Sequence, residues 1–291
     1  MHTLRPIICL ILLGVVACTP VAARYSNELF TDSSCSNTLG TNMHVTTHAT
    51  LFGTGRVRLQ DTYLSPLDYS GPQLFIFRSL ERPTRLLDSK VLFHGEFRAD
   101  ISSTQPRKEN ATYLGGTLGY TAAWLYGWTL SQRFKLCAGP QLAGLVGGLY
   151  NTRNGNNPAQ VYLETNLGAA LQLSYSLRIK HYPITISNQL GVPLLGAMFT
   201  PAYGQSYYEI FSLGHTDHNI RATHPFNAPS FSDRLTVDFP CRKSILRIGY
   251  LIDIRQSDVN NLRRHAYSQA FMIGWVRNIC IIPPLRYEAT R

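Results

Sequence analysis

Residues 161–178 read VYLETNLGAALQLSYSLR, and this stretch decides the fold class. Apolar side chains recur at every second position from Val161 to Leu177 except at Thr165, while Glu164 and Arg178 fall on the opposite face. This alternation predicts a β-strand with one apolar face. The stretch is far longer than the strands of about five or six residues that are usual in soluble sheets. A strand of this length is typical of a membrane-spanning barrel.

The same alternation recurs along the rest of the chain. It is clear over 91–101 and 245–256, and weaker in the other segments. We therefore expect about ten strands, over 43–51, 73–80, 91–101, 114–124, 134–146, 161–178, 182–194, 235–239, 245–256 and 267–275. Pro140 and Pro193 lie inside two of these segments and predict bulges or strand ends, because proline cannot donate to the ladder.

The connections between these strands alternate in length. Short turns are expected near 126–131, 178–182 and 240–244, and longer polar loops at 55–71, 102–111, 150–160, 199–231 and 255–266. Outer-membrane barrels have short periplasmic turns and long extracellular loops. The sequence thus predicts an all-β, transmembrane, antiparallel up-and-down β-barrel with both termini in the periplasm. Residues 206–211 could form half of an extra hairpin, which would give about twelve strands.

Composition excludes the other common classes. Charged residues are 15% of the 291 residues, against about 25% in an average soluble domain. Hydrophobic residues reach 44%, too many for a disordered chain. The mean hydropathy of −0.08 excludes a helical membrane protein. A soluble β-sandwich is opposed by the length of the strands and by Tyr and Trp at their ends.

The N-terminal residues have the pattern of an export signal. Arg5 precedes an apolar run from Ile7 to Ala17 that is too short to span a bilayer. Small residues before position 24 predict a signal peptide over 1–23, cleaved after Ala23. An alternative is lipidation at Cys18, which ends a lipobox-like stretch. The remaining chain divides into an N-terminal periplasmic segment (24–40), the barrel (41–279) and a C-terminal periplasmic tail (280–291).

The cysteines carry little information about function. Outside the export signal they are Cys35, Cys137, Cys241 and Cys280, spaced too widely for a zinc site. Either Cys241 and Cys280 form a disulfide or the four thiols are unrelated.

Several loop and strand motifs carry a resemblance to a known family. They are DTYLSPLDYSG (61–71), YNTRNGNNPAQ (150–160), MFTPAYGQSYYEIFSLG (198–214), HPFNAPSF (224–231) and SILRIGYLIDIRQSDVNNLRRHAYSQAFMIGW (244–275). Together they resemble an uncharacterised outer-membrane β-barrel family of the Bacteroidales, the domain of unknown function 3316, over roughly residues 40–280. The resemblance implies a Gram-negative outer-membrane barrel and carries over no catalytic residue. The tail after Cys280 departs from barrels that end at an aromatic residue of the last strand.

No pattern of catalytic residues or metal ligands stands out. His215, His218 and His224 lie in the long loop near Ser206, Ser212, Ser230 and Glu209, but the His-x-Ser motif of outer-membrane lipid hydrolases is absent. Two loop histidines without a third ligand do not make a metal site. We therefore expect neither an enzyme nor a metal or other cofactor.

The polar faces of the strands predict the lining of the barrel. The candidate lumen-lining residues are His94, Glu96, Arg98, Asp100, Arg133, Lys135, Glu164, Arg178, Arg234, Asp238, Arg247, Asp253 and Arg255. These charges either pair to close the barrel, because an unpaired buried ion is costly, or line a narrow pore that favours anions, because basic groups outnumber acidic ones.

These features favour a structural or interaction-based role, presenting outer loops or binding an envelope component. A narrow channel for small, anionic solutes is the alternative, and an outer-membrane lipid-modifying enzyme is the third. Expected partners are outer-membrane lipid, lipopolysaccharide and an envelope protein, with no nucleic acid. The aromatic loop 199–231 is expected to be ordered and to cap the barrel mouth or dock a partner through Tyr207, Tyr208 and Phe211.

Overall fold

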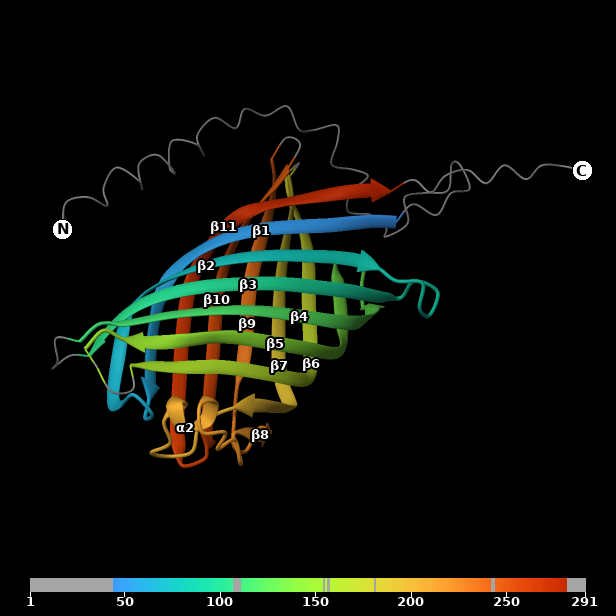
Figure 1. Ribbon diagram of the computed structural model, residues 1–291. Helices are drawn as coiled ribbons and strands as arrows, with labels where there is room; N and C mark the ends of the chain where they lie inside the picture. The colour runs from blue at the N-terminus through green and yellow to red at the C-terminus, as the bar shows by residue number, and fades with distance from the viewer. Residues whose placement is uncertain are drawn as a thin grey trace, which may run out of the picture.

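The computed structural model describes residues 44–106, 111–153, 155, 158–180, 182–241 and 244–281. Over these residues the chain forms a closed antiparallel β-barrel, shown in Figure 1. Neighbouring strands follow the order β6-β5-β4-β3-β2-β1-β11-β10-β9-β7, and β7 pairs again with β6 to complete the ring. The predicted fold class is confirmed.

The ten strands of the ring are long and match the expected segments in order. They are β1 (His44–Asp61), β2 (Ser65–Pro83), β3 (Val91–Pro106), β4 (Tyr113–Thr129), β5 (Phe134–Asn151), β6 (Ala159–Ile179), β7 (Tyr182–Phe199), β9 (Phe231–Cys241), β10 (Ser244–Val259) and β11 (Leu262–Ile281).

Two of the expected long loops are wrong. Residues 55–71 belong to β1 and β2, which are joined by a tight turn at 62–64, and residues 255–266 belong to β10 and β11. The second hairpin turns at Asn260 and Asn261, which have positive φ angles of 56° and 61°. Asparagine tolerates this left-handed backbone, so two residues are enough to reverse the chain.

The segment 200–230, here called the cap, follows β7. It contains the short helix α2 (Tyr207–Phe211) and the short strand β8 (Ile220–Thr223), which pairs with the end of β7. The expectation of an extra hairpin from 206–211 is wrong, because Ser206 caps a helix there: its side chain accepts from the backbone N–H of Glu209. Figure 1 shows the cap at one end of the barrel, here called the cap end.

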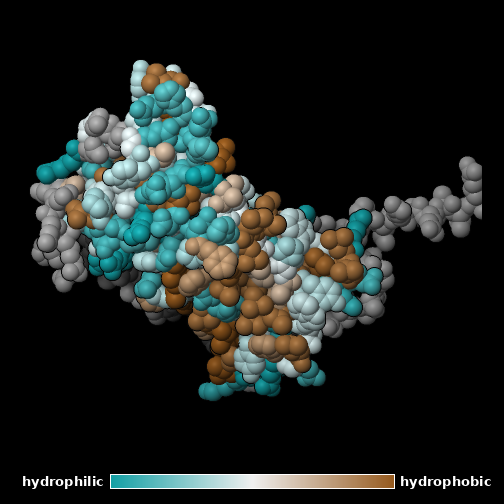
Figure 2. All heavy atoms as spheres, turned by 90° about the horizontal axis from the view of Figure 1, so that it is seen from below, coloured by the Kyte–Doolittle hydropathy of each residue, from teal (hydrophilic) through white to brown (hydrophobic). Residues whose placement is uncertain are grey.

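The strands alternate between a lipid-type outer face and a packed interior. In β2 the side chains of Leu74 and Ile76 are exposed, while those of Phe75 and Phe77 are buried. In Figure 2, hydrophobic side chains gather in a broad band over part of the wall, beside mostly hydrophilic surface. Because the wall is a single layer, a buried side chain in the middle of a strand points into the barrel.

The two strand prolines differ in effect. Pro193 pairs with Gly168, where the register between β6 and β7 shifts, so the expected bulge is present. Pro140 pairs with Ala169 in unbroken register. On its other side, no pairs form between Gln141↔Ala123 and Ala138↔Tyr126, which leaves a local gap in the β4–β5 ladder.

The described cysteines are in two states. Cys137 is a buried free thiol, and Cys241 is disulfide-bonded. The side chain of Cys280 lies outside the described part, as do Cys35, the export signal, the segment 24–40 and residues 282–291. No helix in the described ranges is long and apolar enough to cross a membrane.

Candidate functional site

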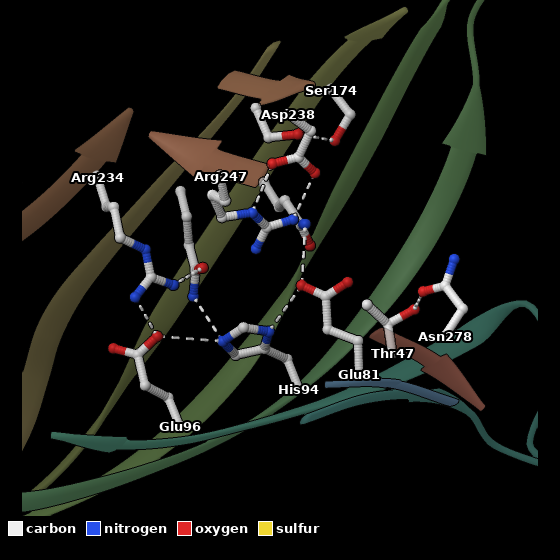
Figure 3. Close-up of polar contacts among 12 residues, drawn as sticks. Thr47, Glu81, His94, Glu96, Ser174, Arg234, Asp238, Arg247 and Asn278 are labelled. Atoms are coloured by element: carbon white, nitrogen blue, oxygen red, sulfur yellow. Dashed lines mark hydrogen bonds and ion pairs between the residues drawn. The ribbon is translucent and has the colours of Figure 1, made fainter. Parts of the chain in front are cut away.

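A network of charged side chains fills the middle of the barrel, and Figure 3 shows its core. His94, on β3, is only 1% exposed. Its Nδ1 lies 3.1 Å from Glu81 Oε1, and its Nε2 lies 3.5 Å from Glu96 Oε2. The amide of Gln189, on β7, lies 3.1 Å from the same Nε2. One imidazole thus links side chains of strands on opposite sides of the ring.

Two arginines extend this network to β9 and β10. Arg234 Nη1 lies 2.5 Å from Glu96 Oε2, and its Nη2 donates to Gln189 Oε1 at 2.5 Å. Arg247 binds Asp238 in a bidentate geometry, with distances of 2.6 and 2.7 Å. Bidentate arginine–carboxylate pairs are directional as well as strong. Asp238 and Arg247 are register partners on the neighbouring strands β9 and β10, so this pair joins the two strands on the inner face of the wall (Figure 3).

A second layer lies nearer to the cap end. Arg98 Nη2 and Arg255 Nε both contact Asp253 Oδ2, each at 3.0 Å. Arg98 Nε also lies 3.3 Å from Asp100, which accepts hydrogen bonds from Gln73 and Thr117 at 2.8 and 2.6 Å. The charges of this layer are therefore paired, as burial requires.

A third set of contacts joins opposite walls at the cap end. Arg264 Nη1, on β11, lies 2.5 Å from Glu164 Oε1, on β6. Its guanidinium also stacks over the Tyr162 ring, 3.6 Å from the centroid. The Tyr162 hydroxyl donates to Asp61 Oδ2 at 2.9 Å, which links β6 to β1.

Apolar side chains occupy the remaining interior. One cluster contains Leu51, Phe75, Phe77, Leu251, Ala270 and Met272. Arg98 lies 5.0 Å from the Phe75 ring centroid, and Arg234 lies 5.6 Å from that of Phe77. Cations over aromatic faces gain stabilisation that is larger where water is excluded. The cluster and the network therefore pack as one interior.

The predicted lining residues separate into two groups. Ten of the thirteen are in the network or its layers: His94, Glu96, Arg98, Asp100, Glu164, Arg234, Asp238, Arg247, Asp253 and Arg255. Arg133, Lys135 and Arg178 are instead exposed near the end of the barrel opposite the cap. Arg133 lies in the turn before β5, and Lys135 and Arg178 lie at strand ends outside the packed interior.

Other interior residues were missed by the sequence analysis. Glu81 and Asp61 fall near strand ends, and Arg264 falls in a segment that was expected to be a loop. Including them, seven described carboxylates (Asp61, Glu81, Glu96, Asp100, Glu164, Asp238 and Asp253) face five arginines (Arg98, Arg234, Arg247, Arg255 and Arg264) and His94. The expected excess of basic groups inside the barrel is wrong for the described residues.

The cap is fixed to the rim at several points. The Tyr207 hydroxyl donates to Gln160 Oε1 at 2.8 Å and accepts from the backbone N–H of Val161 at 2.7 Å. Tyr63 lies in the turn between β1 and β2, and its hydroxyl donates to the carbonyl of Gln205 at 3.1 Å. Burial is the main cause that raises the pKa of both phenols. The two tyrosine rings meet edge to face, with centroids 5.7 Å apart.

The β10–β11 turn holds the opposite side of the cap. Asn260 Nδ2 donates to the carbonyls of Thr200 and His218, at 3.3 and 2.9 Å. Ile210 of α2 is 2% exposed, so the helix packs against its surroundings. The cap therefore contacts the rim through both β6 and the β10–β11 turn.

The three aromatic residues expected on the cap surface differ in exposure. Tyr208 and Phe211 are 66% and 71% exposed. Tyr207 is partly buried, because its hydroxyl is one of the rim contacts described above. Tyr207 is thus placed to hold the cap, and the other two face outward.

Two cavities in the interior are lined by described residues. One has a volume of about 170 Å³ and the other about 50 Å³. Both are lined by Arg98, Asp253, Arg255 and Arg264, which therefore stand between them. Within the described part of the chain, no group of three or more His, Cys, Asp or Glu side chains has the arrangement of a metal site.

Comparisons with known proteins identify the family of this chain but not its function. A family model described as "Protein of unknown function (DUF3316)" matches residues 6–286. No curated protein matches the chain. Solved structures similar to this chain include the outer membrane protease OmpT from Escherichia coli, with 7% identity and a TM-score of 0.41, covering 84% of this chain and 99% of that one.

Two further solved structures are similar to this chain. The transport unit of the autotransporter AIDA-I from Escherichia coli has 7% identity and a TM-score of 0.39, covering 82% of this chain and 92% of that one. An outer membrane channel from Pseudomonas putida F1 has 10% identity and a TM-score of 0.34, covering 80% and 95%.

Proposed function

This chain belongs to the DUF3316 family, and we propose that it is an integral outer-membrane β-barrel with a closed interior and a structural or interaction-based role. The closed ring and the exposed apolar side chains on its outer face support a membrane position, since a lipid-facing wall must satisfy all of its backbone groups internally. The export signal expected over 1–23 supports a location in the outer membrane of a Gram-negative cell. We also propose that this cell belongs to the Bacteroidales.

The observation that carries the proposal is the occupied interior. Layers of charged side chains occupy the interior, from the one that contains Glu81 to the one that contains Asp61 at the cap end. The apolar cluster around Phe77 packs between them. A ring of about eight strands already has an interior that side chains can fill, and ten strands leave little more. The cavities of about 170 and 50 Å³ correspond to pockets between these layers.

The alternative of an anion channel loses its main support. It rested on an excess of basic groups in the lumen, but Arg133, Lys135 and Arg178 are exposed outside the packed interior. The arginines that remain are paired with carboxylates, and opening a water path would separate these pairs. We therefore favour a barrel that does not conduct in its resting state.

The cap supplies the surface for an interaction. Tyr208 and Phe211 are exposed on a segment that is held to the rim by Tyr207 and Asn260. Exposed aromatic side chains on a rigid base are typical of binding surfaces. We propose that this face contacts lipopolysaccharide or another envelope component, and that no nucleic acid or cofactor is involved.

Catalysis is not part of the proposal. Glu209 caps α2 through Ser206, and His224 Nδ1 accepts from the backbone N–H of Phe226 at 3.3 Å. These polar groups of the cap therefore take part in holding its shape.

Planar-bilayer recording of the purified protein tests the proposal. We expect no stepwise conductance from correctly folded protein, whose folding is shown by heat-modifiable migration on gels. Recovery of the protein in the soluble periplasmic fraction would contradict the location, and regular conductance steps would contradict the closed interior.

A further inference from the structure

The wall of the barrel has a seam near the cap end. Strand β9 begins only at Phe231, so its ladder with β7 ends at Gly191↔Ser232 and its ladder with β10 ends at Ile254↔Phe231. Strands β7 and β10 continue beyond these points, to Phe199 and Val259. Strand β8 pairs with the end of β7 from Gly196↔Thr223 to Phe199↔Ile220, and residues 224–230 of the cap fill the space from there to β10.

On the side that faces β10, the described residues close this seam with isolated hydrogen bonds and no ladder, and one of these bonds joins Arg221 Nε to Asn260 Oδ1 at 2.5 Å. The backbone N–H of Asp258 donates to the Asn227 carbonyl at 2.8 Å, and that of Gln256 donates to Ser230 Oγ at 3.3 Å. By contrast, β1 and β11 pair without interruption from His44↔Ile281 to Asp61↔Arg264. A wall held by isolated bonds opens more easily than one held by a continuous ladder.

The larger cavity reaches the seam from the inside, where Ala228, Ser230 and Phe231 are among its lining residues. Its lining includes Asp253 and Arg255, which point inward on β10. It also includes Ile254, which lies between them on the outer face, and Phe231, which pairs with Ile254. The seam residues are therefore the part of the wall that stands between this cavity and the membrane.

The two sides of the seam differ in chemistry. The outer lip is apolar, with Phe231 38% exposed beside Ile254, and Phe226 of the neighbouring cap loop is 94% exposed. The inner end is charged: Arg255 and Arg98 share a single oxygen of Asp253, each at 3.0 Å. Two guanidinium groups on one oxygen leave donors that a further anionic group can use.

The seam also lies at a particular height on the wall. On β10 the outward side chains are apolar up to Ile254, and the next ones are Gln256 and Asp258. An outer surface that changes from apolar to polar marks the boundary between lipid chains and head groups. An acidic lipid-like molecule in the membrane would therefore have its head group level with the seam.

We propose that the seam is a lateral portal, and that the cavity takes the anionic head group of a single-chain acyl amphiphile from the surrounding membrane. The chain of the amphiphile lies along the apolar lip, and its carboxylate or phosphate binds at Arg255. This inference goes beyond the closed barrel proposed above, because a lateral site needs no path for ions along the barrel axis.

Photolabelling with a disulfide staple tests the portal. The probe is palmitate carrying a diazirine next to its carboxylate, applied to membranes that contain the full-length protein. We expect labelling of the cavity around Arg255 in the native protein. The oxidised double variant S230C/Q256C, which staples the seam, should lose this labelling and regain it on reduction.

The matched control is T62C/R263C, which staples two turns at the same end of the barrel without crossing the seam. In the native protein the Thr62 Oγ1 accepts from the Arg263 backbone N–H at 2.9 Å, so the two positions are close enough. The control should label equally when oxidised and reduced. If S230C/Q256C does not migrate as folded barrel, N227C/D258C replaces it. Equal labelling of the oxidised seam and control staples would overturn the proposal.

The head-group site has its own test. Arg255→Gln should weaken labelling by about tenfold, as the loss of one charge-assisted hydrogen bond predicts, while Arg255→Lys should retain most of it. Unlabelled palmitate should compete, and neither acetate nor hexadecyltrimethylammonium should. Competition by acetate would show a site for a free anion, and competition by the cation would show chain binding alone; either overturns the amphiphile site. Conductance recordings are independent of these results, so failure here is distinct from failure of the closed barrel.

Discussion

The hydroxyl of Tyr162 donates a hydrogen bond of 2.9 Å to Asp61 Oδ2, although the two residues lie on opposite walls of the barrel. Tyr162 is on β6 and Asp61 is on β1, and four strands separate these two in either direction around the ring. Two side chains therefore span the interior at this level.

Removing this hydroxyl should destabilise the barrel. Tyr162→Phe leaves the Asp61 carboxylate, which is 2% exposed, without one of its donors. The expected cost is about 1–3 kcal/mol of unfolding free energy, the penalty for a buried polar group that loses its partner. Urea unfolding followed by tryptophan fluorescence measures it. The control is Tyr250→Phe, whose exposed hydroxyl donates to Gln269; equal losses in both variants would contradict the cross-barrel role.

The Arg247–Asp238 pair allows a second test by a double-mutant cycle. Asp238→Leu alone leaves Arg247 buried without its bidentate partner, and should cost about 3–5 kcal/mol. The double variant Asp238→Leu/Arg247→Met should recover much of this loss, because it removes the unpaired charge and keeps the volume. If the loss of unfolding free energy in the double variant equals the sum of the losses in Asp238→Leu and Arg247→Met, the two side chains do not act as a pair.

The cap should loosen at acidic pH. The backbone N–H and hydroxyl of Ser206 lower the pKa of Glu209 below its ordinary value. Since the folded pKa is the lower one, the stabilisation is complete above the ordinary glutamate pKa and is lost as pH falls through the folded value. Hydrogen-exchange protection of α2, corrected for intrinsic rates, should decline over that range. Glu209→Gln should remove the pH dependence, and a decline that persists in this variant would assign it to another group.

Labelling of intact cells tests the orientation of the barrel. A cysteine at the exposed Asp217, in the cap, should react with an impermeant maleimide, and one at Lys180, in the turn between β6 and β7, should not. The native protein is the control for background labelling of its own thiols. Reaction at Lys180 in intact cells would reverse the topology.

The strands that the sequence predicted well are those with one apolar and one polar face. Residues 161–178 show this pattern throughout, and β6 covers them. Strand β2 was recognised only in part, because Leu74, Phe75, Ile76 and Phe77 are all apolar and alternation disappears where the interior is apolar too. The end of β1 was missed for a different reason: Gly55 packs so closely against β11 that an added Cβ would lie 1.8 Å from the Gln269 carbonyl oxygen. A glycine required by close backbone approach resembles a loop residue in the sequence.

The sequence predicted which residues face the interior, but not which of them contact each other. Alternation placed Glu96, Arg234 and Asp253 inside, whereas their partners depend on which strands face each other and on the shear of the barrel. Arg264 was missed because the Asn260-Asn261 turn was read as part of a long loop. For α2 the signal was present: Ser206 and Glu209 have the spacing of a capping box.

Single-channel recording of a cap-deleted barrel tests the closed interior most directly. Residues 203–226 are replaced by a short Gly-Ser linker, and folding is checked by heat-modifiable migration. The charged layers from His94 to Arg264 lie below the cap and remain intact in this variant. We predict that both the native and the cap-deleted protein are silent, and that steps appear only when Glu81, Arg234 and Arg247 are also replaced by serine. Regular conductance from the cap-deleted barrel alone would show that the cap is the only seal and would contradict a closed interior.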